Sequence, residues 1–62
     1  MQKKVQKFYF DGVEVQIYER LVGEFSVGYE ATFHIGKQFY RVYGATSTAC
    51  WVFACQEIRE KK

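Results

Sequence analysis

The sequence predicts an α+β fold: a four-stranded antiparallel sheet of two hairpins, with one C-terminal helix packed on one face. Two turn dipeptides, Asp11-Gly12 and Gly36-Lys37, each lie between runs of strand-forming residues. After Gly44, the spacing of apolar residues changes from alternation to the helical pattern. The chain of 62 residues is long enough for one domain, 1–62, and for no more.

The first hairpin is predicted by Asp11-Gly12, because this dipeptide favours a type I′ turn with positive φ at both central residues. Strands at 4–10 and 13–20 then pair Phe10 with Val13 and Phe8 with Val15. This register gathers the apolar residues of both strands on one face, which we expect to face the core.

The second hairpin is predicted by the alternation of residues 25–35 and by Gly36-Lys37, which favours a type II′ turn. Strands at 25–35 and 38–43 then pair His34 with Phe39 and Ala31 with Val42. Gly23 is expected to turn the chain between the hairpins. Gly28 marks a bulge, a bend or a close backbone approach. The expected core face of the second hairpin is Phe25, Val27, Tyr29, Ala31, Phe33, Ile35, Tyr40 and Val42.

A helix is predicted near 47–60, because Thr46 or Ser47 can cap its start and basic residues gather at its end. A fifth strand from Ala49 to Cys55 is the competing interpretation, and it would suggest a small barrel. The apolar stripe expected to face the sheet is Trp51, Ala54, Cys55 and Ile58.

Ala49, Val52 and Phe53 form a second apolar stripe on the opposite side of this helix. A helix on a single sheet buries only one side, so we expect this stripe to be an oligomer or partner contact. The alternative is that it packs against the loop of Gly23 or Gly44. Self-association is favoured because a chain this small usually needs an additional stabilising device.

The cysteines do not supply that device. Cys50 and Cys55 are five residues apart, about 140° around a helix, so their thiols point apart and suit a reducing compartment. His34 is the one histidine, so no zinc site is expected, and we predict no metal and no cofactor. We expect no enzyme, because no nucleophile and base converge. A thiol-based redox function is a weaker hypothesis.

Aromatic and basic side chains share the second face of the predicted sheet. Such a face can stack single-stranded bases, or it can serve a protein partner, since Tyr and Arg are common interface anchors. Glu14 and Glu30 are expected on the same face and would repel phosphates. The candidate residues are Lys7, Tyr9, Tyr18, His34, Phe39, Arg41 and Tyr43.

The sequence therefore favours a small non-catalytic interaction protein, a homodimer that binds another protein. Compact chains of this kind are often accessory or inhibitory factors in phage and prokaryotic genomes. The alternative is a single-stranded nucleic-acid-binding module that uses the aromatic and basic face. We expect a cytoplasmic protein without a membrane partner, because no apolar run approaches membrane-spanning length.

Overall fold

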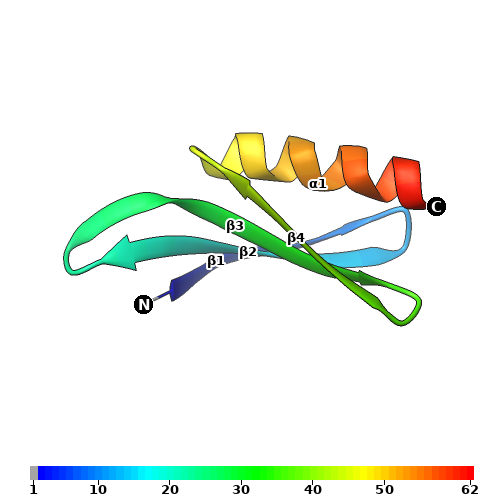
Figure 1. The fold of residues 1–62 in the computed structure, drawn as a ribbon, viewed down its shortest axis with the longest axis horizontal. Helices are drawn as coiled ribbons and strands as arrows, with labels where there is room; N and C mark the ends of the chain where they lie inside the picture. The colour runs from blue at the N-terminus through cyan, green and yellow to red at the C-terminus, as the bar shows by residue number, and fades with distance from the viewer. Residues whose placement is uncertain (1) are drawn as a thin grey trace.

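The computed structural model describes residues 2–62 and has the predicted α+β architecture (Figure 1). Helix α1 (Ser47–Lys61) packs across one face of an antiparallel sheet, mainly against the third and fourth strands. The fifth-strand interpretation of 49–55 is wrong, since these residues lie within the helix. The strands follow in the order β1 (Gln2–Phe10), β2 (Val13–Val22), β3 (Phe25–Ile35) and β4 (Gln38–Gly44).

Both predicted turns are present. Asp11 and Gly12 have φ angles of 51° and 78°, as a type I′ turn requires, and Gly36 has a φ of 61°. The predicted registers of both hairpins follow from these turns. Gly23, with a φ of 62°, makes a third two-residue turn between β2 and β3. The sheet is therefore a continuous meander of three hairpins, in which β1 and β4 are the two edges.

A bulge changes the face presented at the start of β3. Between the Arg20–Gly28 pair and the Val22–Phe25 pair, β3 has one residue more than β2. Gly28 has a φ of 120°, which glycine tolerates. A slip of one residue moves the preceding side chains to the other face, and this hairpin also projects past the start of α1 (Figure 1). The expectation that Phe25 and Val27 belong to the core is therefore wrong: they are 76% and 52% exposed.

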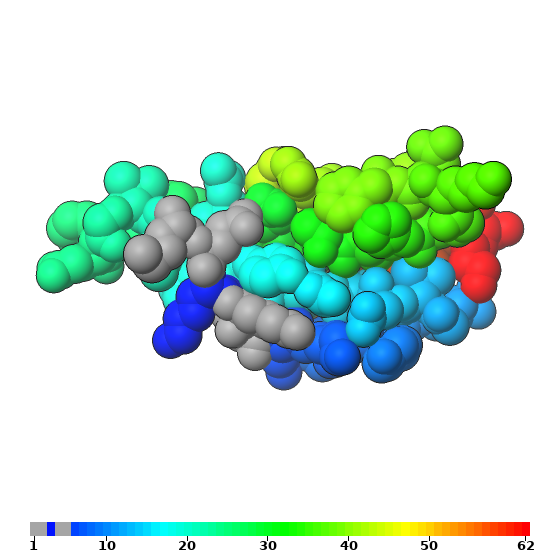
Figure 2. All heavy atoms as spheres, turned by 90° about the horizontal axis from the view of Figure 1, so that it is seen from below, coloured from blue at the N-terminus to red at the C-terminus, as the bar shows by residue number. Residues whose placement is uncertain are grey.

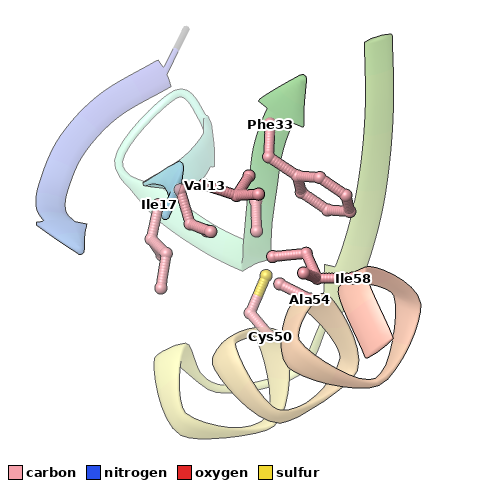
Figure 3. Close-up of a cluster of buried hydrophobic side chains, with 8 residues drawn as sticks. Val13, Ile17, Phe33, Cys50, Ala54 and Ile58 are labelled. Atoms are coloured by element: carbon pink, nitrogen blue, oxygen red, sulfur yellow. The ribbon is translucent and has the colours of Figure 1, made fainter. Parts of the chain in front are cut away.

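The core lies between α1 and the two central strands (Figure 3). Phe33, Ile17 and Ile58 are the largest of its fully enclosed side chains, and each contributes about 1.5–3 kcal/mol by leaving water. The buried cluster comprises Val13, Val15, Ile17, Ala31, Phe33, Cys50, Ala54 and Ile58.

Thr46 caps the start of the helix, and its Oγ1 accepts a hydrogen bond of 3.1 Å from the Ala49 N–H. Its fully buried stripe is Cys50, Ala54 and Ile58. The prediction is confirmed for Ala54 and Ile58, whereas Trp51 and Cys55 are only half-buried and Cys50 was not predicted to face the sheet. The reason lies at Gly44, where a Cβ atom would come within 2.7 Å of the Cys50 nitrogen. Glycine lets the first turn of α1 approach β4 closely, and this contact rotates Cys50 toward the sheet.

Trp51 lies on the flank of α1 that faces β1. Its ring centroid is 4.7 Å from that of Phe8 and 6.0 Å from that of Phe10. At the other end of the helix, the Lys62 Nζ donates a hydrogen bond of 2.7 Å to the Asp11 carbonyl in the β1–β2 turn. These contacts fix which side of the helix faces each edge of the sheet.

Candidate interaction surfaces

Figure 2 shows the face of the sheet opposite α1, called here the helix-free face. The strand pairing places the predicted aromatic and basic residues on this face. Directly paired residues point to the same side of a sheet. Tyr18 pairs with Glu30, and His34 pairs with Phe39, so neighbouring strands present these side chains together. The pairing places all seven candidates on this face: Lys7, Tyr9, Tyr18, His34, Phe39, Arg41 and Tyr43.

Glu14 is the centre of a polar network along β1 and β2. Its Oε1 lies 3.3 Å from the Lys7 Nζ and accepts a hydrogen bond of 3.3 Å from the Tyr9 hydroxyl. Gln16 donates to the other carboxylate oxygen and accepts a hydrogen bond from the Tyr18 hydroxyl. The hydrogen bond to Lys7 is the largest of the effects that lower the pKa of Glu14, so this carboxylate stays charged. The positive charge of Lys7 is therefore neutralised within the face.

Glu30 and Arg41 form a second ion pair at the centre of β3 and β4. The Glu30 side chain is only 7% exposed, and its Oε2 lies 3.2 Å from the Arg41 Nε. Hydrogen bonding to Tyr43, and then the charge of Glu30, raise the pKa of the Arg41 guanidinium. The guanidinium also lies 5.5 Å from the centroid of the Phe39 ring. Arg41 is thus half-exposed but held in one orientation.

One member of the face was not predicted. Arg20 pairs with Gly28 in the ladder, and its guanidinium lies 5.1 Å from the centroid of the Tyr43 ring. The alternation of β2 could have identified it, since Arg20 follows Tyr18 at the same parity. His34 is exposed, as expected, and its ring lies 4.9 Å from that of Phe39.

A shallow hollow of about 400 Å³ lies over the middle of this face. Glu30 and Arg41 contribute polar groups to it, and Tyr18, His34 and Phe39 contribute ring surface. Aromatic rings beside a few fixed polar groups are typical of a surface that a partner covers. The hollow is open, and its shape suits a side chain of a partner better than an enclosed small molecule.

The helix presents a second, separate surface. Val52 and Phe53 are each 44% exposed, so the alternative that they pack against a glycine loop is wrong for both. Ala49 is half-buried, and its backbone lies directly over Gly44. Whether these three residues contact a partner stays a prediction.

The two thiols are in surroundings that keep them protonated. Burial is the main cause that raises the pKa of both Cys50 and Cys55. Cys50 is fully buried and its Sγ lies 3.8 Å from the Val42 carbonyl oxygen. A protonated, enclosed thiol is a poor nucleophile, which weakens the redox hypothesis.

Within residues 2–62 no three side chains of His, Cys, Asp or Glu gather as metal ligands would. In the same range, no helix has the length and apolar character needed to cross a membrane. Comparison with known proteins found no matching family model, curated protein or solved structure.

Proposed function

We propose that the chain is a non-catalytic interaction protein that works as a homodimer and binds another protein through its helix-free face. The observation that carries this proposal is an aromatic face on which two cations, one on each edge strand, are already neutralised by carboxylates of the neighbouring strands. Lys7 and Arg41 lie 3.3 Å and 3.2 Å from the carboxylates of Glu14 and Glu30. Exposed Tyr and Phe rings around a held Arg have the composition of a protein interface.

A protein partner fits this face better than a nucleic acid does. Affinity for a phosphate backbone comes chiefly from cations that can neutralise phosphates. Here Glu14 and Glu30 compete with phosphates for Lys7 and Arg41, and the two carboxylates would themselves repel a polyanion. An Arg side chain that is already oriented loses little conformational freedom when a partner covers it, which favours binding.

The alternative is a single-stranded nucleic-acid-binding module. Its support is the exposure of three rings on the same face: Tyr9 is 67% exposed, Phe39 48% and Tyr43 50%. Base stacking on such rings does not depend strongly on sequence. Fluorescence anisotropy with a labelled oligonucleotide separates the alternatives. Tight binding at low salt that falls steeply as salt rises would contradict the protein-binding proposal.

The protein-binding proposal is tested by co-purification of the tagged chain from its native cells, followed by mass spectrometry. The double variant Tyr9→Ser/Tyr43→Ser removes two exposed rings from the helix-free face. Val27→Ser, an exposed position in the projecting β2–β3 hairpin, is the matched control. We expect the double variant to lose at least tenfold of the specifically retained partner while the control retains it. Equal retention by the double variant and the control would contradict the proposed surface.

A further inference from the structure

The two edges of the sheet differ in how well they are protected against another strand. β1 has a register shift between Lys4 and Gln6, and the sequence places lysines along it. Bulges and edge lysines are devices that prevent strand addition. β4 pairs with β3 without any register shift over its seven residues, and it contains neither lysine nor proline. The structure therefore leaves β4 as the open edge.

The outward backbone groups of β4 can be assigned from the turn. A two-residue turn is closed by a hydrogen-bonded pair, which here is Ile35–Gln38. Hydrogen-bonded and non-hydrogen-bonded pairs alternate along an antiparallel ladder. Phe39, Arg41 and Tyr43 therefore direct their N–H and C=O groups away from β3. Among residues 2–62, no hydrogen bond outside the sheet ladders reaches these groups.

Apolar side chains border this edge on both sides of the sheet. Phe39 and Tyr43 are about half-exposed on the helix-free face. Phe53 follows Trp51 by two residues, about 200° around the helix. Because Trp51 faces β1, Phe53 lies on the flank of α1 that faces the β4 side.

We propose that a second copy of this chain adds to the exposed edge of β4, strand to strand and antiparallel. This inference rests on the proposed homodimer and names β4 as the strand through which its two copies contact each other. A two-fold axis perpendicular to the sheet joins the two sheets into one and keeps both helices on the same side. The two Phe53 side chains then face each other across the axis.

The length of the open edge suits such a dimer. The seven residues of β4 span about 24 Å, and joining two four-stranded sheets at this edge gives eight strands, a size that open sheets commonly reach. Identical chains also satisfy the symmetry directly, since both contribute the same unprotected strand. No second edge is required, and the lysine-bearing β1 stays exposed at each end of the joined sheet.

The charges select the register. Direct pairing of Arg41 with the second copy's Arg41 would place like charges opposite each other, which is unfavourable. A shift of two residues toward the β3–β4 turn instead places Arg41 opposite Phe39 of the second copy, the same type of ring that its guanidinium already approaches within its own chain. Each guanidinium then keeps its bond to Glu30 and faces a ring, an arrangement that favours a cation–π contact.

Two matched proline variants test the edge. Phe39→Pro removes an outward N–H from β4, and Tyr9→Pro removes an outward N–H from β1. Both replace an exposed aromatic residue and leave the inner ladder intact. By sedimentation velocity over a concentration series, we expect the wild type and Tyr9→Pro to dimerise with similar Kd. For Phe39→Pro we expect a Kd at least tenfold higher, with circular dichroism verifying that each variant folds.

Hydrogen exchange of the wild type gives an independent readout that needs no variant. Amides of Phe39 and Arg41 should gain at least tenfold protection as concentration rises through the Kd, while those of Lys7 and Tyr9 should not. Phe53→Asp should also weaken the dimer, and Val22→Asp, at a more exposed position, should not.

The outcomes separate this inference from the proposed homodimer. A wild type that stays monomeric at millimolar concentration overturns both. A dimer that persists unchanged in Phe39→Pro, or one whose formation protects β1 amides instead, overturns the β4 edge alone. In that case the homodimer stands and its contact lies elsewhere.

Discussion

Replacing Gly44 by alanine should separate the helix from the sheet at the point where β4 passes into α1. The added Cβ would lie 2.7 Å from the Cys50 nitrogen, 3.0 Å from the Cys50 Cα and 3.2 Å from the Ala49 carbonyl carbon. All three are backbone atoms, so no rotamer change can relieve the contact. The first turn of α1 must move outward, and Cys50 and Ala54 lose contact with the sheet.

The expected cost follows from these distances. A methyl group forced into a packed site costs about 1–3 kcal/mol, and contact with backbone places Gly44→Ala near the upper end. Alanine also lowers the conformational entropy of the unfolded chain, which stabilises the folded state by about 0.4–1 kcal/mol. We therefore expect a net loss of about 2 kcal/mol in the free energy of unfolding. In a domain this small, that lowers Tm by about 8–16 °C.

Urea unfolding followed by Trp51 fluorescence measures this loss, because Trp51 reports on the packing of α1 against β1. Gly36→Ala is the matched control. At Gly36 no atom lies within 4 Å of the added Cβ. The alanine is destabilising there only because it must adopt the left-handed φ of 61°, which costs about 1 kcal/mol. A Gly44→Ala variant no less stable than Gly36→Ala would refute the argument that close packing at Gly44 positions the helix.

Three further predictions follow from burial and charge. Phe33 is buried and Phe25 is exposed. Phe33→Ala should therefore lower the free energy of unfolding by about 3–5 kcal/mol, and Phe25→Ala by less than about 0.5 kcal/mol. Equal losses measured by urea unfolding would contradict the observed core. The hydrogen bond to Lys7 is the main cause that holds the pKa of Glu14 below its ordinary 4.5. The charged Glu14 therefore stabilises the fold above pH 4.5, and this contribution is lost as the pH falls below that value. In Glu14→Gln, the free energy of unfolding should fall less steeply with acid than in the wild type. Burial raises the pKa of Cys50 above 9.0, so the unfolded thiol ionises first and stability should fall as pH rises above 9. In a variant lacking the other cysteine, the native thiol should react with iodoacetamide at least tenfold more slowly than the urea-unfolded thiol.

The sequence was sufficient for the sheet because its turns are chemically distinctive. Asp11-Gly12 and Gly36-Lys37 each determine a two-residue loop, and a two-residue loop leaves one register for the strands beside it. The faces of β1, β2 and β4 follow from that register. The shared face of Tyr18, Phe39 and Arg41 was predictable for the same reason.

The sequence identified Gly28 as a bulge, a bend or a close approach, but the change of parity that the bulge causes and the rotation of the helix were beyond sequence reasoning for a physical reason. Phe25 and Val27 continue the alternation of β3 through Gly28, and only the backbone angle of Gly28 shows that the parity changes. On the helix, Cys50 and Cys55 fit an apolar stripe equally well by spacing. The contact with Gly44 decides between them, and it depends on the distance between two elements.

The buried state of Glu30 was also not predictable. A glutamate at an alternating position is usually solvent-exposed, and Glu30 was expected to contribute only charge to the second face. Its enclosure depends on neighbours from two other strands: Tyr18 pairs with it from β2 and Tyr43 from β4. That enclosure turns Arg41 from a free cation into a held one, which is what favours a protein partner over a polyanion.

The position of β4 connects the two surfaces that the sequence treated separately. This strand presents Phe39 and Tyr43 on the helix-free face. On the other side of the sheet, it lies next to the flank of α1 that carries Phe53. A second copy at this edge would make the two helix-free faces one continuous surface, which a partner could engage twice. A partner bound at both copies gains effective concentration. Phe53→Asp should therefore weaken retention of the partner protein as well as dimerisation, although Phe53 lies on the opposite side of the sheet. Normal retention by the monomeric variant would show that one face is sufficient.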